Sequence, residues 1–281
     1  MVCHSGVEIG QGINTKVAQT VASKLGVDIS LIRVVAASTD RNANGGGTGG
    51  SGTSETCCAA AIDACNTLND RLLPSKEANP LLSWDQMLMT VPSDVSLNAE
   101  GWFSPNGEPN GQPFQYFVYG ACLTEVELDV LTGAINVLSS EIVYDCGKSL
   151  NPAVDIGQIE GAYMMGVGYF LTERVSYDAA GVLETSGTWE YKPPMVAEVP
   201  SVFNVTLIKG YPNKDGILGS KAVGEPPCVL ANSVYFAAKQ AIMSARQDAG
   251  LTGFVSLEAP LTVDVRQQAC AVTPNRLVMP Y

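Results

Sequence analysis

The sequence KAVGEPP, residues 221–227, places an acidic side chain between a glycine and two prolines, directly before an apolar helical pattern over residues 230–249. Gly224 permits backbone conformations that other residues avoid. Pro226 biases Glu225 toward extended backbone, and the two proline rings limit the motion of the turn. These constraints favour a carboxylate held still at the start of a helix, as a catalytic base requires. A plain helix-start turn with a surface glutamate is the alternative, because acidic side chains favour helix N-termini.

A second motif, GVEIGQG at residues 6–12, leads directly into another helical pattern. Val17, Val21 and Leu25 recur at every fourth position, and Gly26 is a typical residue for ending such a helix. The free backbone N–H groups and the dipole at the start of this helix suit an anionic ligand, and Gln11 can donate or accept an amide hydrogen bond. A plain glycine turn explains the same residues without a ligand.

A glycine-rich tract, NANGGGTGGSGTSE at residues 42–55, follows a predicted buried strand at residues 31–37. Its glycines formally match GxGxxG, but no second strand ending in an acidic residue follows, so a nicotinamide-dependent dehydrogenase has little support. A phosphate-binding P-loop is excluded because no Gly-Lys-Ser/Thr follows. The tract is therefore either a flexible loop or a backbone cradle for a phosphate. The helix after it is expected to end at Pro74.

The second half of the chain begins with a predicted hairpin. Two strands at residues 114–129 and 135–145 flank a glycine turn, and a further strand is expected at residues 202–208. Acidic residues alternate along the first of these strands, which a solvated strand face explains well.

The third motif, SLNPAVDIGQIEGA at residues 149–162, opens a glycine-rich helical pattern that continues to Phe170. Each glycine inside a helix costs up to about 1 kcal/mol relative to alanine. The glycines therefore suggest that a ligand or another helix packs closely against this helix, at positions Gly157, Gly161, Gly166 and Gly168.

These three motifs, in this order, resemble the xanthine dehydrogenase and aldehyde oxidase family of molybdenum hydroxylases. The resemblance implies that Glu225 is the general base of the reaction. It also implies that the molybdopterin cofactor is bound by residues of the turn, of the glycine-rich loop and of the third motif: Gln11, Gly50, Ser51 and Gln158. No residue of the chain is assigned as a metal ligand.

The implied reaction is oxidative hydroxylation of a purine such as hypoxanthine or xanthine, of another N-heterocycle, or of an aldehyde. FAD and [2Fe–2S] clusters are expected on regions outside this chain, which has no cysteine spacing for such a cluster. We therefore expect a C-terminal molybdopterin-binding fragment that is inactive alone and works with missing N-terminal domains or partner subunits of a homodimeric parent. A non-catalytic relative that keeps the fold as a binding or structural protein is the alternative.

The composition is that of a packed globular protein, with 281 residues, 46% hydrophobic and 16% charged. A net charge of −12 and a single histidine argue against a nucleic-acid partner. No apolar run of about 18 residues predicts a membrane span. The eight cysteines lack any CxxC spacing, which favours free thiols in a reducing compartment and a cytoplasmic location.

The sequence thus predicts an α+β fold in which mixed β-sheets are flanked by helices in two lobes, as in the second half of the molybdopterin-binding domain of the xanthine dehydrogenase type. Residues 1–110 form the first lobe, with the Gln-Gly turn and the glycine-rich cofactor loop. Residues 111–281 form the second lobe, with the DIGQ helix and the loop that carries Glu225.

Overall fold

The computed structural model describes residues 1–104 and 114–273, which form two compact units. The first unit comprises Met1–Phe117, Cys146–Asp155 and Lys209–Ala222, and the second comprises Val118–Asp145, Ile156–Ile208 and Val223–Tyr281. The chain therefore passes from one unit to the other several times. The predicted lobe boundary near residue 110 lies outside the described residues.

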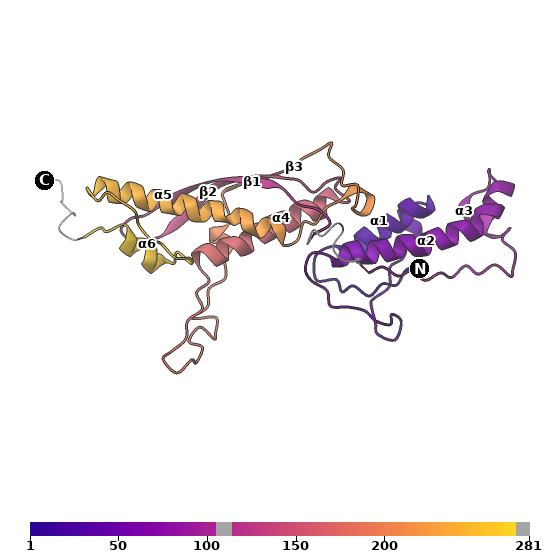
Figure 1. Ribbon diagram of the computed structural model, residues 1–281, viewed down its shortest axis with the longest axis horizontal. Helices are drawn as coiled ribbons and strands as arrows, with labels where there is room; N and C mark the ends of the chain where they lie inside the picture. Colours follow the sequence, from indigo (N-terminus) through magenta and orange to yellow (C-terminus); the bar gives the residue numbers. More distant parts are fainter. Residues whose placement is uncertain (105–113, 274–281) are drawn as a thin grey trace. The chain divides into compact units, whose positions relative to one another are not determined.

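Two helices dominate the first unit, α1 (Ile13–Leu25) and α2 (Thr53–Ala78). They are the indigo and purple helices of Figure 1. Their apolar faces form a shared core made of aliphatic and cysteine side chains, namely Ile13, Val17, Val21, Cys57, Cys58 and Cys65. The fourfold spacing in α1 explains its buried face, because residues one turn apart share one side of a helix. Shorter elements complete this unit: η1 (Ile29–Leu31), α3 (Trp84–Leu88) and η4 (Ile217–Gly219).

Two predictions for this unit are wrong. Residues 31–37 form no regular strand; this region holds the end of η1 and one isolated parallel bridge between Val2 and Val34. A strand needs neighbouring strands to hydrogen-bond, and sequence propensity alone does not supply them. The helix α2 also continues past Pro74 to Ala78, with Leu72 and Ser75 buried on either side of the proline. Burial on both sides offsets the hydrogen bond that a proline removes.

The second unit contains a mixed three-stranded sheet in the order β1-β2-β3. The strands β1 (Gly120–Leu128) and β2 (Ile135–Tyr144) form the predicted hairpin and pair antiparallel, with a register shift between Glu125 and Val126. The strand β3 (Val202–Leu207) pairs parallel with β2. Helices combined with a mixed sheet agree with the expected α+β class.

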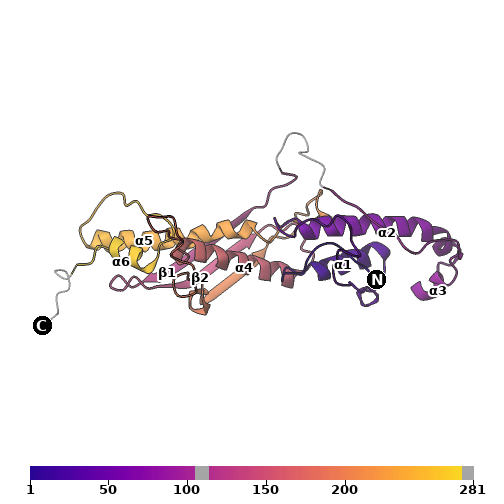
Figure 2. The same cartoon turned by 90° about the horizontal axis from the view of Figure 1, so that it is seen from below.

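Two long helices of the second unit lie along the sheet, as Figure 1 and Figure 2 show. They are α4 (Pro152–Leu171), whose first residues belong to the first unit, and α5 (Asn232–Asp248). The covered face carries the buried side chains of Ile142 and Tyr144, while Glu125 and Glu127 point to solvent on the other face. The prediction of a solvated acidic strand face is therefore confirmed.

One buried cation ties the end of α4 to other parts of the second unit. Arg266, in helix α6 (Val263–Ala269), is only 3% exposed and donates hydrogen bonds to the backbone carbonyls of Gly133, Leu171 and Leu261. Burial lowers the pKa of its guanidinium to about 10. Carbonyl oxygens thus satisfy this cation, and Leu171 gains a partner at a helix end, where carbonyls otherwise lack one.

Candidate functional site

The Gln11 turn is braced by its own glutamine. The Gln11 side chain donates from Nε2 to the carbonyl of Val7 at 2.9 Å and accepts from the N–H of Ile9 at 2.7 Å. Gly12 takes a left-handed φ of 72° at the start of α1, and an added Cβ there would collide with Val154. An amide side chain has two N–H groups and two acceptor lone pairs, so Gln11 keeps the capacity for one further donor and one further acceptor contact.

The expected free N–H groups of this turn are already bonded, which corrects the sequence-based prediction of an anion site there. The carboxylate of Glu8 accepts from the backbone N–H groups of Gly10 (3.2 Å), Gly12 (2.8 Å) and Asn14 (3.1 Å). A negative side chain at a helix N-terminus also complements the helix dipole. The sequence held a signal for this role, because Glu8 lies within the quoted motif, four residues before Gly12.

The glycine-rich loop offers an open backbone surface. Gly50 and Ser51 have left-handed φ angles of 63° and 55°, and Gly52, which precedes α2, is right-handed at −101°. Consecutive residues of opposite hand direct their N–H groups to the same side, an arrangement that binds anions. An added Cβ at Gly46, Gly47, Gly49 or Gly50 would meet nothing within 4 Å, so these glycines are not needed for packing among the described residues.

The structure brings the Gln11 turn and the glycine-rich loop together within the first unit. The N–H of Val7 donates to Thr48 Oγ1 at 2.9 Å. Gly6 lies where a Cβ would collide with Ile13, at the start of α1, and contact Thr53, at the start of α2. Two segments about 40 residues apart in sequence therefore share one surface, as the cofactor hypothesis requires.

A buried ion pair fixes α1 to the first turn of α4. Lys16 Nζ lies 2.7 Å from Asp155 Oδ1, and the two side chains are 8% and 3% exposed. Ser149 donates to the other carboxylate oxygen at 2.6 Å. Gln19 adds a second link, because its amide donates to the carbonyl of Leu150 at 3.1 Å. The Asp of the DIGQ motif is thus an anchor for α4, a role that the sequence did not reveal.

Gln158 lies one turn after Asp155 on α4, at a half-buried position of the second unit. Across residues 1–104 and 114–273 its side-chain amide has no hydrogen-bond partner. Its full donor and acceptor capacity is therefore available to a ligand, in contrast to that of Gln11.

The glycines of α4 divide into two groups. Gly157 and Gly161 border open space, whereas a Cβ at Gly166 would collide with the carbonyl of Cys228 and with Ala231. Gly168 packs against Pro194 in the same way. Close packing against another segment, one of the two expected reasons for the glycines, thus accounts for Gly166 and Gly168.

Glu225 is the N-cap of η5 (Pro226–Ala231), a short helix that packs on α4 at Gly166. Its backbone is helical, with φ −86° and ψ −32°, and not extended as Pro226 predicts. The first hydrogen bond of η5, from Cys228 N to the Glu225 carbonyl at 3.0 Å, stabilises this conformation against the proline bias. The Glu225 side chain is exposed, so the expected apolar burial is also corrected.

The charge of Glu225 acts on its neighbour Cys228. Burial raises the pKa of the Cys228 thiol, and the negative charge of Glu225 raises it further. The thiol therefore stays protonated beside the carboxylate, and no second negative charge competes with Glu225 for a proton.

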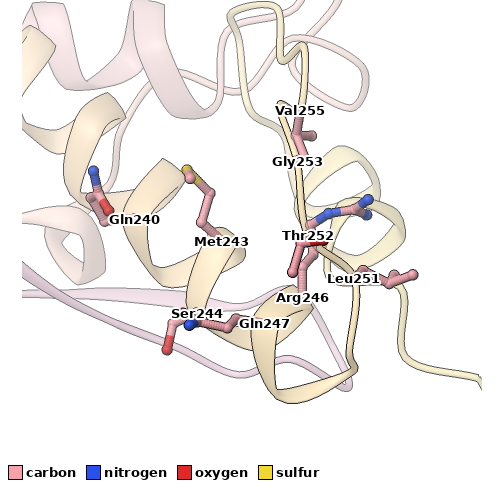
Figure 3. A pocket seen from close by; sticks show the side chains of 9 residues that line it. All are labelled: Gln240, Met243, Ser244, Arg246, Gln247, Leu251, Thr252, Gly253 and Val255. Atoms are coloured by element: carbon pink, nitrogen blue, oxygen red, sulfur yellow. The ribbon is translucent and has the colours of Figure 1, made fainter.

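A pocket in the second unit lies apart from these segments in the sequence. It has a volume of about 290 Å³ and opens between the C-terminal half of α5 and residues 251–255, as Figure 3 shows. Arg246 lines it and donates to the carbonyl of Ala269 at 3.0 Å. The lining includes none of the five predicted site residues. Within the described residues, no group of three or more His, Cys, Asp or Glu side chains could hold a metal ion.

An α+β fold with an open glycine-rich loop, a paired turn and an unpartnered helix glutamine defines a cofactor-binding domain. The molybdopterin cofactor-binding domain family matches residues 1–200. The chain belongs to this family, in the form found in the molybdopterin-binding region of xanthine dehydrogenases and aldehyde oxidases.

Two relatives illustrate the match. The chain is 44% identical over 278 residues to xanthine dehydrogenase of Drosophila pseudoobscura pseudoobscura, covering 96% of the chain and 21% of that protein. It is 40% identical over 279 residues to aldehyde oxidase 1 of Macaca fascicularis, with the same coverage of 96% and 21%. The chain thus spans about a fifth of the length of these relatives.

Solved structures show the same fold. Quinoline 2-oxidoreductase from Pseudomonas putida 86 superposes with a TM-score of 0.77 at 22% identity, covering 97% of this chain and 36% of that one. The two-lobed α+β expectation for the fold class is confirmed by this likeness. In the part of the chain that the structure describes, no helix has the length and apolar character needed to cross a membrane.

Proposed function

We propose that this chain is the C-terminal molybdopterin-binding part of a molybdenum hydroxylase that oxidatively hydroxylates a purine, another N-heterocycle or an aldehyde. The observation that carries the proposal is the 44% identity to a xanthine dehydrogenase across 96% of the chain, with all three motifs inside the matched stretch. Because the chain spans a fifth of such relatives, we expect the isolated chain to be inactive and to require the other regions of its parent.

The described residues fit the cofactor. The N–H groups around Gly50 and Ser51 suit a phosphate, and the unpartnered amide of Gln158 and the remaining capacity of Gln11 suit the polar edge of a pterin. When bound, the molybdenum cofactor supplies the oxygen-transfer and electron-accepting chemistry of the reaction. FAD and [2Fe–2S] clusters, on other parts of the parent, carry the electrons away.

Glu225 is the proposed general base. Its exposed carboxylate can accept a proton at either oxygen, and η5, packed against Gly166, holds its backbone in place. Pro226 and Pro227 limit the freedom of the turn further. Substrate class, a homodimeric parent and a cytoplasmic location belong to the proposal as well.

The test uses the full-length protein that contains this region. Glu225→Gln should lower turnover of xanthine and of an aromatic aldehyde by about 10²- to 10⁴-fold, while molybdenum content is retained. Glu125→Gln, on the exposed face of β1, is the matched control and should leave turnover unchanged. Full activity in Glu225→Gln, or a parent that never binds molybdenum, would contradict the proposal and favour a non-catalytic relative that keeps the fold.

A further inference from the structure

The hydroxyl group of Tyr116 joins two segments that the proposed function places in the cofactor site. It lies 3.2 Å from Glu55 Oε2 and accepts from the N–H of Ala222 at 3.0 Å. Glu55 is in the first turn of α2, four residues after Ser51. Ala222 precedes Glu225 by three residues, and all three bonded residues belong to the first unit.

The direction of each hydrogen bond in this chain of groups is determined by chemistry. A backbone N–H can only donate, so the Tyr116 oxygen accepts from Ala222 and its proton must point elsewhere. The Glu55 carboxylate accepts that proton and so orients the lone pairs of the hydroxyl toward the amide. Burial and the charge of Glu55 raise the pKa of Tyr116, which keeps the hydroxyl protonated.

Other contacts hold the backbone on either side of this point. The N–H of Lys221 donates to the carbonyl of Cys146 at 2.8 Å, and Asn213 donates to the carbonyl of Ser220 at 3.0 Å. After Glu225, η5 packs against Gly166. Between these two anchored stretches lie Val223 and Gly224, where glycine makes the backbone flexible.

We propose that Tyr116 is a positioning residue for Glu225 and that the Glu55–Tyr116–Ala222 chain couples the glycine-rich loop to the proposed base. This inference rests on the proposed function. Fixing Ala222 shortens the free stretch that precedes Glu225 and so limits the directions in which the carboxylate points. A misdirected base lowers the rate of the chemical step more than it weakens substrate binding.

The experiment compares Tyr116→Phe with Tyr235→Phe in the full-length protein. Tyr235 on α5 also loses one hydrogen bond as phenylalanine, to the carbonyl of Leu257 at 2.7 Å, but this bond involves no proposed site segment. Tyr116→Phe should lower kcat about tenfold, with KM and molybdenum content unchanged. Tyr235→Phe should keep kcat within about twofold of the wild type.

Two changes at Glu55 sharpen the test. Glu55→Gln keeps an oxygen that accepts from the hydroxyl and should retain kcat, whereas Glu55→Ala should lose as much as Tyr116→Phe. The double variant Tyr116→Phe/Glu55→Ala should lose no more than either single variant, because both act through one hydrogen-bonded chain.

A readout independent of turnover completes the design. Hydrogen exchange of peptides covering residues 218–226 should become faster in Tyr116→Phe and stay unchanged in Tyr235→Phe. Wild-type exchange or wild-type kcat in Tyr116→Phe would overturn the inference, and so would a kcat loss that only follows molybdenum loss. Failure of the proposed function would show separately, as a wild-type parent without molybdenum or an active Glu225→Gln.

Discussion

The two units join their helices with different kinds of buried polar groups. In the first unit, α1 meets the first turn of α4 through the charged pair of Lys16 and Asp155, with Ser149 as a third member. In the second unit, neutral hydroxyl groups connect helix and strand. Tyr163 on α4 bonds Ser140 on β2 at 2.7 Å and Thr124 on β1 at 2.9 Å.

The hydroxyl cluster also reaches the second helix of its unit. Ser233, on α5, bonds Thr124 Oγ1 at 2.7 Å and donates to Cys122 Sγ at 3.2 Å. Each hydroxyl can donate and accept, so the remaining members can pair again when one is removed. A buried ion pair has no such freedom, because each charge depends on one specific partner.

This difference bears on how the two units tolerate change. Loss of one partner of a buried ion pair leaves an uncompensated charge, which costs about 3 to 5 kcal/mol, whereas a neutral hydrogen bond contributes about 1 kcal/mol. The first unit therefore gains a specific register between α1 and α4 at the risk of a large loss. The second unit gains adaptable support for its helices.

The largest expected effect is that of Lys16→Met. It leaves Asp155 buried with only Ser149 as a side-chain partner, so the free energy of unfolding of the first unit should fall by about 3 to 5 kcal/mol. Hydrogen exchange of α1 amides and urea unfolding followed by circular dichroism measure this loss. Lys24→Met, an exposed change on the same helix, is the control and should stay within about 0.5 kcal/mol.

A double variant tests the cause of that loss. Lys16→Met combined with Asp155→Leu removes both charges and should recover part of the stability. A loss below about 1 kcal/mol in Lys16→Met would remove the distinction between the two units.

The second effect concerns alkaline pH in the first unit. Burial raises the pKa of the Cys58 thiol from 9.0 to about 11, so the folded state holds this proton more tightly than the unfolded chain does. The associated stability is fully present below pH 9 and is lost as the pH rises to 11, by about 2 to 3 kcal/mol at most.

Urea unfolding at pH values from 8 to about 11 checks this expectation. Cys58→Ala should flatten the alkaline decline, whereas Cys3→Ala, at a half-buried position outside the core cluster, should keep it. An unchanged decline in Cys58→Ala would assign the pH dependence to other groups.

The smallest effect is expected in the second unit. Tyr163→Phe removes the central hydroxyl, but Thr124 and Ser140 remain 3.3 Å apart and Thr124 keeps Ser233. The free energy of unfolding should therefore fall by only about 1 kcal/mol. Tyr169→Phe, at an exposed position on the same helix, serves as the control. A loss above about 3 kcal/mol for Tyr163→Phe would show that neutral networks are as intolerant as ion pairs.

Much of the architecture was predictable because it depends on residues close in sequence. The period of Val17, Val21 and Leu25 predicted α1, and alternation around a glycine turn predicted the β1–β2 hairpin. The three motifs indicated the family, which the comparisons confirm. The roles of Gln11, Gly50, Ser51, Gln158 and Glu225 stay predictions, which the proposed variants can test.

Local rules failed where a residue's neighbours come from elsewhere. Pro74 was expected to end α2, yet the helix continues between buried side chains. Pro226 was expected to extend Glu225, yet the hydrogen bond from Cys228 keeps it helical. The turn before α1 was expected to bind an anion, yet Glu8 occupies its N–H groups.

The sequence by itself determined the family, the order of the motifs, and most helices and strands, because periodicity and motif spacing are local properties of the chain. Tertiary structure alone decided that Lys16 pairs with Asp155 and that Tyr116 joins Glu55 to Ala222. These partners are separated by 61 to 139 residues. Their pairing depends on which side chains lose water together when the chain folds, and burial of that kind is a property of the folded molecule.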